Sequence, residues 1–146
     1  GDIMVVATSG FINRAVIGDL VIGMFKNQGG AGFVTDGALR DLIGLRKMGL
    51  GCWGAGLTPA SPYTTGPGAV GHRILIADQT VHDGDMIVAD EDGVVVVPFA
   101  DIPVVIERLE AIKTMEATRD AEVANGLSIP ARITDLLATD QVEFDD

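Results

Sequence analysis

The sequence has a single cysteine, Cys52, and no apolar run long enough to cross a membrane. One cysteine cannot form a disulfide within the chain, which is typical of a protein of the reducing cytoplasm. The longest apolar stretches, such as the one that begins at Val94, fall far short of the roughly 18 residues that a membrane-spanning helix needs. We therefore expect a soluble, globular, cytoplasmic protein that has no membrane partner.

Basic residues are also scarce. Lysine and arginine together number 10 against 21 acidic residues, which gives a formal net charge of -11. Nucleic-acid affinity rests largely on lysine and arginine side chains that neutralise phosphates, and here these residues form no stripe. We therefore expect no nucleic-acid partner. This argument leaves open a protein that regulates a nuclease through protein contacts.

The length of the chain and its first two apolar runs indicate one α/β domain over residues 1–146. Ile3–Ala7 and Ala31–Thr35 have the composition of buried strands, and apolar spacing predicts helices over Leu20–Gln28 and Ala38–Met48. The order strand, helix, strand, helix implies a parallel strand pair joined by a right-handed crossover.

The second half of the chain changes in character. Glycine, proline, serine and threonine are dense from Gly49 to Gly71, which predicts a long ordered loop with short extended pieces that serves a site or an interface. Three strands and two helices are predicted beyond it, at Arg73–Ala77, Met86–Ala89, Val94–Val97, Asp101–Asn125 and Ile129–Ala138. The strands predict an antiparallel or mixed β layer. We find no internal sequence repeat.

Two glycine-rich stretches, which begin at Gly49 and Gly66, match the spacing of a dinucleotide-binding fingerprint. That fingerprint needs a strand before its first glycine and a helix that opens at its last, so that backbone amides meet the pyrophosphate. The first stretch follows a predicted helix, and the second runs into a predicted strand. We therefore expect no bound nucleotide cofactor.

Charged residues stand where α/β folds build sites. Asp19 lies at the start of the first predicted helix, and Arg40 and Asp41 lie in the first turn of the second. Ligands collect beyond the carboxyl ends of strands, and helix starts offer free amides to anions, so the two helix starts could face one pocket. The pattern alone is weak, because such residues are most often caps or solvated ion pairs.

Longer stretches carry a family resemblance. Asp19, a spacer of twenty residues and the pair Arg40-Asp41 resemble the D-x20-R-D signature of the RraA-like family, and the segments Gly32–Asp41 and Gly84–Pro98 resemble two further signatures of it. This family holds the metal-dependent 4-hydroxy-4-methyl-2-oxoglutarate and 4-carboxy-4-hydroxy-2-oxoadipate aldolases and the regulators of ribonuclease E activity.

The resemblance implies a swivelling β/β/α fold, self-association into trimers or hexamers, and an N-terminal part of the family fold that this chain lacks. It implies a class II pyruvate aldolase, which cleaves a 4-hydroxy-2-oxo dicarboxylic or tricarboxylic acid to pyruvate and a second oxo acid, with oxaloacetate decarboxylation as a further activity. The alternative is a non-enzymatic regulator that binds a ribonuclease. That branch lacks the acid after the arginine, whereas Asp41 is present here.

The resemblance also implies residue roles. Asp41 would be the direct protein ligand of Mg²⁺, Mn²⁺ or another divalent cation, with waters completing the shell, a mix that hard cations favour. Glu116, from the long helix of a neighbouring subunit, would reach those waters. Arg40 would hold the 2-oxo acid and offset the charge of the enolate, and Asp19 would position a catalytic water.

The implied substrate contacts lie at the start of the first predicted helix. Gly18 and the backbone amides of Leu20 and Val21 would receive the substrate carboxylate, together with Arg40. A base must also take the proton of the substrate hydroxyl group, and a water oriented by Asp19 is the candidate.

Overall fold

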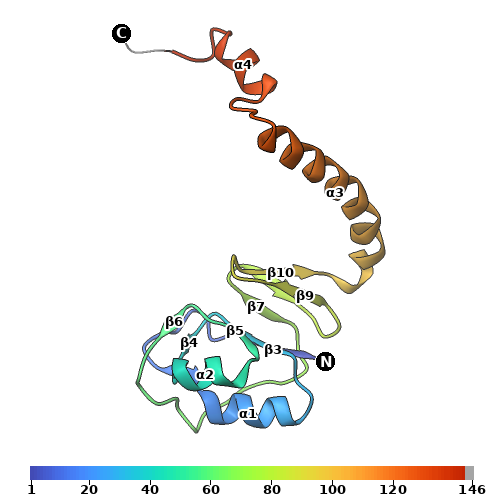
Figure 1. Cartoon of the computed structure of the whole chain (residues 1–146). Coiled ribbons are helices and arrows are strands. Elements are labelled where there is room, and N and C mark those ends of the chain that lie inside the picture. The colour runs from blue at the N-terminus through green and yellow to red at the C-terminus, as the bar shows by residue number, and fades with distance from the viewer. Residues whose placement is uncertain (144–146) are drawn as a thin grey trace. The chain divides into compact units, whose positions relative to one another are not determined.

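The structure, a computed structural model, describes residues 1–143 (Figure 1). The chain forms two compact units, one from Gly1 to Ile102 and one that begins at Pro103. The first unit contains all the strands of the described residues and the first two helices, and the second contains nearly all of α3 and all of α4. That the units act as one domain stays a prediction.

The elements of the first unit recur in a simple pattern. They are β1 (Ile3–Val6), β2 (Ala15–Ile17), α1 (Asp19–Asn27), β3 (Gly32–Thr35), β4 (Ala38–Leu39), α2 (Leu42–Met48), β5 (Gly51–Trp53), β6 (Gly56–Leu57), β7 (Ile74–Ile76), β8 (Gln79–Val81), β9 (Met86–Ala89), β10 (Val94–Val97) and the short 3-10 helix η1 (Phe99–Asp101). Two strands and a helix therefore occur twice, and a third pair of strands follows. This structural repeat has no counterpart in the sequence.

The paired strands build two parallel sheets. The first strand of each pair joins the sheet β1-β3-β5, and the second joins the sheet β2-β4-β6. The parallel pairing of β1 with β3 confirms the prediction made for the first two strands. Because neighbours within each sheet run the same way, the carboxyl ends of the strands of one sheet lie at one edge.

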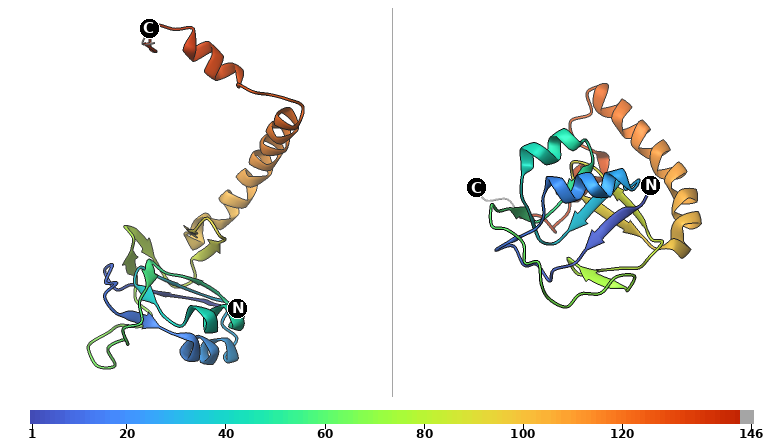
Figure 2. Two further views of the ribbon diagram at one scale, coloured as in Figure 1. Left: turned by 60° about the vertical axis from the view of Figure 1, so that its left-hand side comes forward. Right: turned by 90° about the horizontal axis from the view of Figure 1, so that it is seen from below.

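The central strand β3 is buried on both faces. Phe33 is 0% exposed and packs with Ile22 of α1 and Leu45 of α2, while Val34 packs with Ile76 and Val81 of the β7–β8 hairpin. Adjacent residues of a strand point to opposite faces, so these two side chains join two separate cores. Figures 1 and 2 show α1 and α2 side by side on one side of the sheet.

The strands after Gly71 form two antiparallel hairpins, β7–β8 and β9–β10, which confirms the predicted antiparallel layer. A side-chain contact joins this layer to the parallel sheet, because Trp53 Nε1 on β5 donates to the carbonyl of Asp90, 2.7 Å away. Burial raises the pKa of the neighbouring Cys52 thiol, which packs against the core, as expected of a structural cysteine.

The prediction of a helix over Ala38–Met48 is wrong at the start of that range. Ala38 and Leu39, 1% and 5% exposed, form β4 between β2 and β6, and α2 begins only at Leu42. Two strand residues are too few to show an alternating pattern, so tertiary pairing decided their conformation. Arg40 and Asp41 therefore lie between a strand and a helix. The short strands β2 and β8 were also missed.

The second unit contains α3 (Ile102–Ala124), which confirms the predicted long helix, and α4 (Ala131–Leu137), which is shorter than predicted. Beyond Val105 every side chain of α3 is exposed, including those of Leu109 and Ile112. Among residues 1–143, no helix combines the length and the apolar character that crossing a membrane requires. The cytoplasmic location stays a prediction.

Asp36 ties the loop after β1 to the end of β3. Its Oδ1 accepts hydrogen bonds from the amide of Thr8 at 2.6 Å and from the Thr8 hydroxyl at 2.9 Å, and its Oδ2 accepts one from the amide of Gly10 at 2.9 Å. Burial alone would raise the pKa of Asp36. The hydrogen bonds to its ionised form outweigh burial, so the pKa lies below the ordinary value of 3.8.

We expect Asp36→Ala to lower the free energy of unfolding by about 1–3 kcal/mol, because the Thr8 and Gly10 amides lose their acceptor. A carboxylate whose pKa is lower in the folded state stabilises the fold above its unfolded pKa, and this contribution is lost as the pH falls through the folded pKa. The deficit of the variant should therefore shrink in urea unfolding curves recorded from about pH 7 down to about pH 3.

The matched control is Asp2→Ala, because Asp2 is exposed and its carboxylate has no hydrogen-bond partner within residues 1–143. This variant should unfold like the wild type at every pH. A deficit of Asp36→Ala that keeps its full size at the acid end would contradict the proposed role of the ionised Asp36 carboxylate.

Candidate functional site

The site residues predicted from the sequence gather at one edge of the sheet β2-β4-β6. Three segments follow its three strands directly: Gly18-Asp19 after β2, Arg40-Asp41 after β4 and Thr58–Ser61 after β6. Hydrogen bonds continue across the strand ends, from the Arg40 amide to the Ile17 carbonyl at 3.2 Å and from the Thr58 amide to the Leu39 carbonyl at 3.0 Å. The parallel direction of the strands therefore places all three segments together.

The absence of a side chain at Gly18 lets Arg40 and Asp41 approach the start of α1. A Cβ at Gly18 would overlap Asp41 Oδ2 and would lie 2.9 Å from Arg40 Nε. Arg40 Nε itself lies 3.1 Å from Asp41 Oδ2, an ion pair without hydrogen-bond geometry. The Arg40 and Asp41 side chains are 32% and 44% exposed, so a small solute can reach both.

Asp41 has a left-handed backbone, with φ 58° and ψ 42°. This conformation costs most residues about 1–2 kcal/mol, although Asp adopts it more readily than most. It turns the chain from β4 into α2, where the Leu45 amide donates to the Asp41 carbonyl at 2.9 Å. Backbone strain at a half-exposed acid beside an arginine is typical of a functional position.

Asp19 faces the start of α2. A Cβ at Gly44 would overlap the Asp19 carboxylate, with 2.6 Å to its Cγ, so the carboxylate lies directly against this glycine. Gly18 has no side chain with which to cap α1, and no side chain among the described residues caps it by a hydrogen bond. The amides of Leu20 and Val21 belong to that turn, and amides of this kind attract anions.

The loop after β6 is held against the site through Ser61. Arg40 Nη1 donates to Ser61 Oγ at 2.9 Å, and Arg14 Nη1 donates to the Ser61 carbonyl at 3.0 Å. The Arg14 guanidinium also lies 4.6 Å from the centre of the Tyr63 ring. Composition had predicted a functional loop here, but not Ser61, because an exposed serine in a glycine- and proline-rich stretch carries no signal of its own.

The side chains at this edge that could hold a metal are carboxylates. Within residues 1–143 no group of three or more His, Cys, Asp and Glu residues gathers as a metal cage. Asp41, with Asp19 nearby, offers oxygen donors only, and one or two carboxylates completed by water suit Mg²⁺ better than Zn²⁺. The residues present therefore fit a hard divalent cation held through Asp41.

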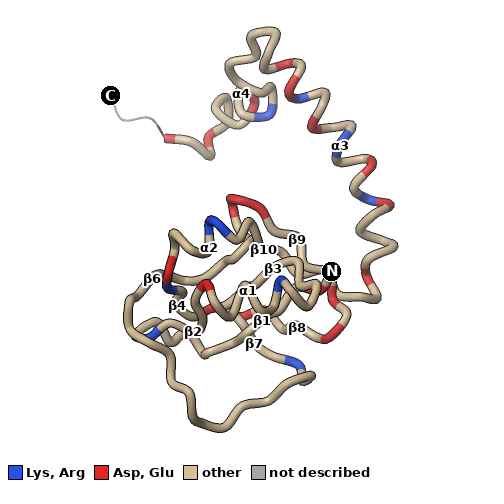
Figure 3. Tube along the Cα trace, turned by 60° about the horizontal axis from the view of Figure 1, so that its bottom comes forward, with Lys and Arg blue, Asp and Glu red and all other residues tan. Residues whose placement is uncertain are grey.

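Glu116 lies on α3, in the second unit, where its side chain is exposed. It is four residues after Ile112 and seven after Leu109, a spacing that places all three on one helix face. The grooves of this unit are lined by residues such as Lys113 and Asn125 and contain none of the predicted site residues. Figure 3 shows acidic and basic residues interspersed along α3.

Comparison with known proteins assigns the family. Residues 1–96 match the family model described as RraA-like, Aldolase/RraA. The chain belongs to the RraA-like family. It is 32% identical over 127 residues to a Halalkalibacterium halodurans protein whose name, 4-hydroxy-4-methyl-2-oxoglutarate aldolase, is given as provisional. That match covers 87% of this chain, which spans only 60% of the length of the relative.

Solved structures agree with this RraA-like fold. An uncharacterized Pseudomonas syringae protein matches with a TM-score of 0.80 and 27% identity, over 88% of this chain and 64% of that one. Streptomyces coelicolor RraAS2, described as an unusual member of the RNase ES inhibitor RraA family, matches with a TM-score of 0.77 and 31% identity, over 84% and 63%. The relatives thus include both a named aldolase and a ribonuclease inhibitor family, so membership alone does not choose between the two functions.

We expect Gly44→Ala to displace the Asp19 carboxylate without unfolding the protein. The matched control is Gly23→Ala in α1, where a Cβ would meet only Met48 Cε and Sδ at 3.6 Å, an ordinary contact. Replacing a helical glycine by alanine stabilises a helix by about 0.5–1 kcal/mol, and only Gly23→Ala should gain this in full.

Thermal unfolding measures the stability of both variants, and amide NMR shifts measure the local change. The amides of Leu20 and Val21 should shift in Gly44→Ala more than in Gly23→Ala. Equal gains in stability with no shift at the start of α1 would contradict the close packing of Asp19 against Gly44.

Proposed function

We propose that the protein is a divalent-metal-dependent pyruvate aldolase, which cleaves a 4-hydroxy-2-oxo dicarboxylic or tricarboxylic acid to pyruvate and a second oxo acid and also decarboxylates oxaloacetate. The observation that carries this proposal is the cluster of Asp41, Arg40 and Asp19 at one edge of the sheet β2-β4-β6. A carboxylate for a cation, a guanidinium beside it and a second carboxylate suit a reaction that passes through an enolate.

Asp41 would hold the cation, Mg²⁺, Mn²⁺ or another divalent ion, because it is the half-exposed carboxylate at the strand ends. When bound, the cation supplies a Lewis acid that polarises the 2-oxo group of the substrate. Lys26 and Lys47 offer no Schiff-base route at this edge, since they lie in the last turns of α1 and α2, and Lys26 donates to the Met48 carbonyl there.

Cleavage moves an electron pair from the bond between C3 and C4 of the substrate into an enolate. The Arg40 guanidinium, held by Ser61 and Asp41, stabilises the negative oxygen where it forms. A water that donates a hydrogen bond to Asp19 takes the proton of the 4-hydroxyl group and passes it to the Asp19 carboxylate. C4 thereby becomes the carbonyl carbon of the second oxo acid, and the enolate takes up a proton to give pyruvate. The first-turn amides of α1 receive the substrate carboxylate and so fix its orientation.

The alternative is a regulator that binds a ribonuclease, which the names of the structural relatives support. The provisional name of the 32% identical relative supports the aldolase. The intact Asp41 favours the enzyme, because a protein that only binds a partner does not require a strained acidic residue beside a guanidinium.

We expect the purified protein to release pyruvate from 4-hydroxy-4-methyl-2-oxoglutarate and from oxaloacetate with Mg²⁺, and to lose this release in the presence of a chelator. Asp41→Asn should reduce the metal-dependent rate roughly a hundredfold or more, because Asn tolerates the left-handed backbone but lacks the charge. A coupled lactate dehydrogenase assay measures pyruvate.

The matched control is Asp92→Asn in the β9–β10 turn, where the carboxylate is exposed and makes no hydrogen bond within residues 1–143, while the backbone amide donates to Asp90 Oδ1. This variant should keep the wild-type rate. No pyruvate from either compound with the wild type would contradict the aldolase and would favour the ribonuclease-binding regulator.

We further propose that the protein assembles into trimers or hexamers in which Glu116 of one subunit completes the site of a neighbour. Ile102, Val105, Leu109 and Ile112 follow one another at spacings of three and four residues along α3, and Glu116 takes the next place in this stripe. Leu109 and Ile112 of this stripe are exposed, and an exposed apolar surface is normally covered by a partner, so the partner that covers them meets Glu116.

Mixed oligomers test the shared site. Asp41→Asn and Glu116→Gln should each lose activity, and co-expression of the two should restore part of it, because some sites then combine an intact Asp41 with an intact Glu116. Co-expression of Asp41→Asn with Arg40→Ala should restore nothing, since both residues come from one segment. Full turnover by a verified monomer would contradict a site that is shared between subunits.

A further inference from the structure

Two arginine side chains meet at Ser61. Arg40 Nη1 donates to its hydroxyl at 2.9 Å and Arg14 Nη1 donates to its carbonyl at 3.0 Å. Two guanidinium groups held against one residue repel each other, and an anion between them relieves that repulsion. In a chain whose net charge is -11, this is a local concentration of positive charge.

The two groups differ in their partners. Arg40 has a counter-ion, Asp41, whereas no carboxylate within residues 1–143 lies within 4.0 Å of the Arg14 guanidinium nitrogens. The Arg14 guanidinium stacks on Tyr63, and the Tyr63 ring in turn lies 6.5 Å from the ring of Phe11. Stacking occupies the face of the guanidinium and leaves its edge for a carboxylate.

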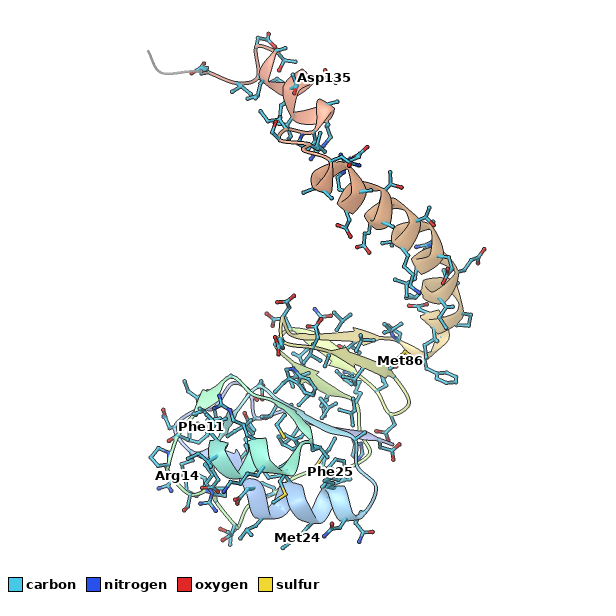
Figure 4. All side chains as sticks on the ribbon, in the orientation of Figure 1. Phe11, Arg14, Met24, Phe25, Met86 and Asp135 are labelled. Carbon is cyan, nitrogen blue, oxygen red and sulfur yellow. The ribbon has the colours of Figure 1, made fainter. Side chains whose placement is uncertain are left out.

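The strand β2 holds the backbone beside Arg14 in place. It directly precedes β2, whose first residue, Ala15, is buried and donates its amide to the Ala60 carbonyl at 3.0 Å. Figure 4 labels Arg14 and Phe11, which lie near one another in the first unit. A group whose backbone is fixed by a strand and whose guanidinium is already hydrogen-bonded to Ser61 loses less freedom when it binds a ligand, which favours selective binding.

We propose that Arg14 binds the distal carboxylate of the substrate, while Arg40 holds the 2-oxo acid end. The inference rests on the proposed aldolase function and assigns a residue to its substrate class, 4-hydroxy-2-oxo acids that carry a second carboxylate. Ser61, which contacts both guanidinium groups, sets their separation. A substrate without the second carboxylate leaves Arg14 without its partner and is disfavoured.

The test compares two substrates that differ at the distal end, 4-hydroxy-2-oxoglutarate with a carboxylate and 4-hydroxy-2-oxopentanoate with a methyl group. The wild type should have the higher kcat/KM for the dicarboxylate. Arg14→Met should reduce this preference roughly ten- to a hundredfold, chiefly through KM, because a charge-assisted pair is lost. Arg14→Lys should fall between them, since it keeps the charge without the planar fork.

Arg46→Met is the matched control, because Arg46 is an exposed arginine in the last turn of α2, and the preference should stay unchanged. A purely structural role of Arg14 would lower kcat/KM for both substrates alike, and that result would overturn the subsite. Arg40→Ala should abolish turnover of both substrates, which separates the loss of catalysis from the loss of selectivity.

Binding without turnover keeps the two proposals distinct. Calorimetry with 2-oxoglutarate and 2-oxopentanoate makes the same comparison between a distal carboxylate and a methyl group. The subsite is supported if Arg14→Met weakens the binding of 2-oxoglutarate but not the binding of the monocarboxylate. This holds even if no pyruvate is released, because the absence of pyruvate release would overturn only the aldolase. Equal binding of 2-oxoglutarate by the variant and the wild type would overturn the subsite.

Discussion

Backbone hydrogen bonds between β2, β4 and β6 bring three segments that are far apart in the sequence to one edge of a sheet. These strands are two or three residues long, so their pairing depends on the core beside them. Ile17 of β2 and Leu39 of β4 belong to that core, where they pack with Ile22 of α1 and Leu45 of α2. The same packing that stabilises the first unit therefore positions the charged residues of the site.

Two glycines and the strained backbone of Asp41 allow the charged side chains of the site to lie close together. Gly18 and Gly44 leave room for the side chains of Asp41 and Asp19, so the start of each helix accommodates an acid from the other strand-to-helix connection. The left-handed conformation of Asp41 turns the chain between β4 and α2 and costs some stability. Close approach and local strain at the same place are what a preorganised site requires.

Charge explains why arginines matter in this acidic chain. A net charge of -11 repels an anionic oxo acid, although salt largely screens this repulsion at distances beyond about 8–10 Å. The Arg40 guanidinium lies just after β4, Arg14 lies just before β2, and Ser61 holds both guanidinium groups by hydrogen bonds. The loop that carries Ser61 therefore contributes to the electrostatics of the site as well as to its shape.

The sequence alone determined the RraA-like family, the parallel pairing of the first two strands and the long helix α3, because signature residues, β-branched runs and helical spacing are local signals. The tertiary structure decided that Ala38-Leu39 is a strand, that two strands and a helix recur, and that Arg14 and Arg40 share Ser61. Arg14 and Ser61 are 47 residues apart, and their contact depends on how the strands pair, which no local spacing encodes.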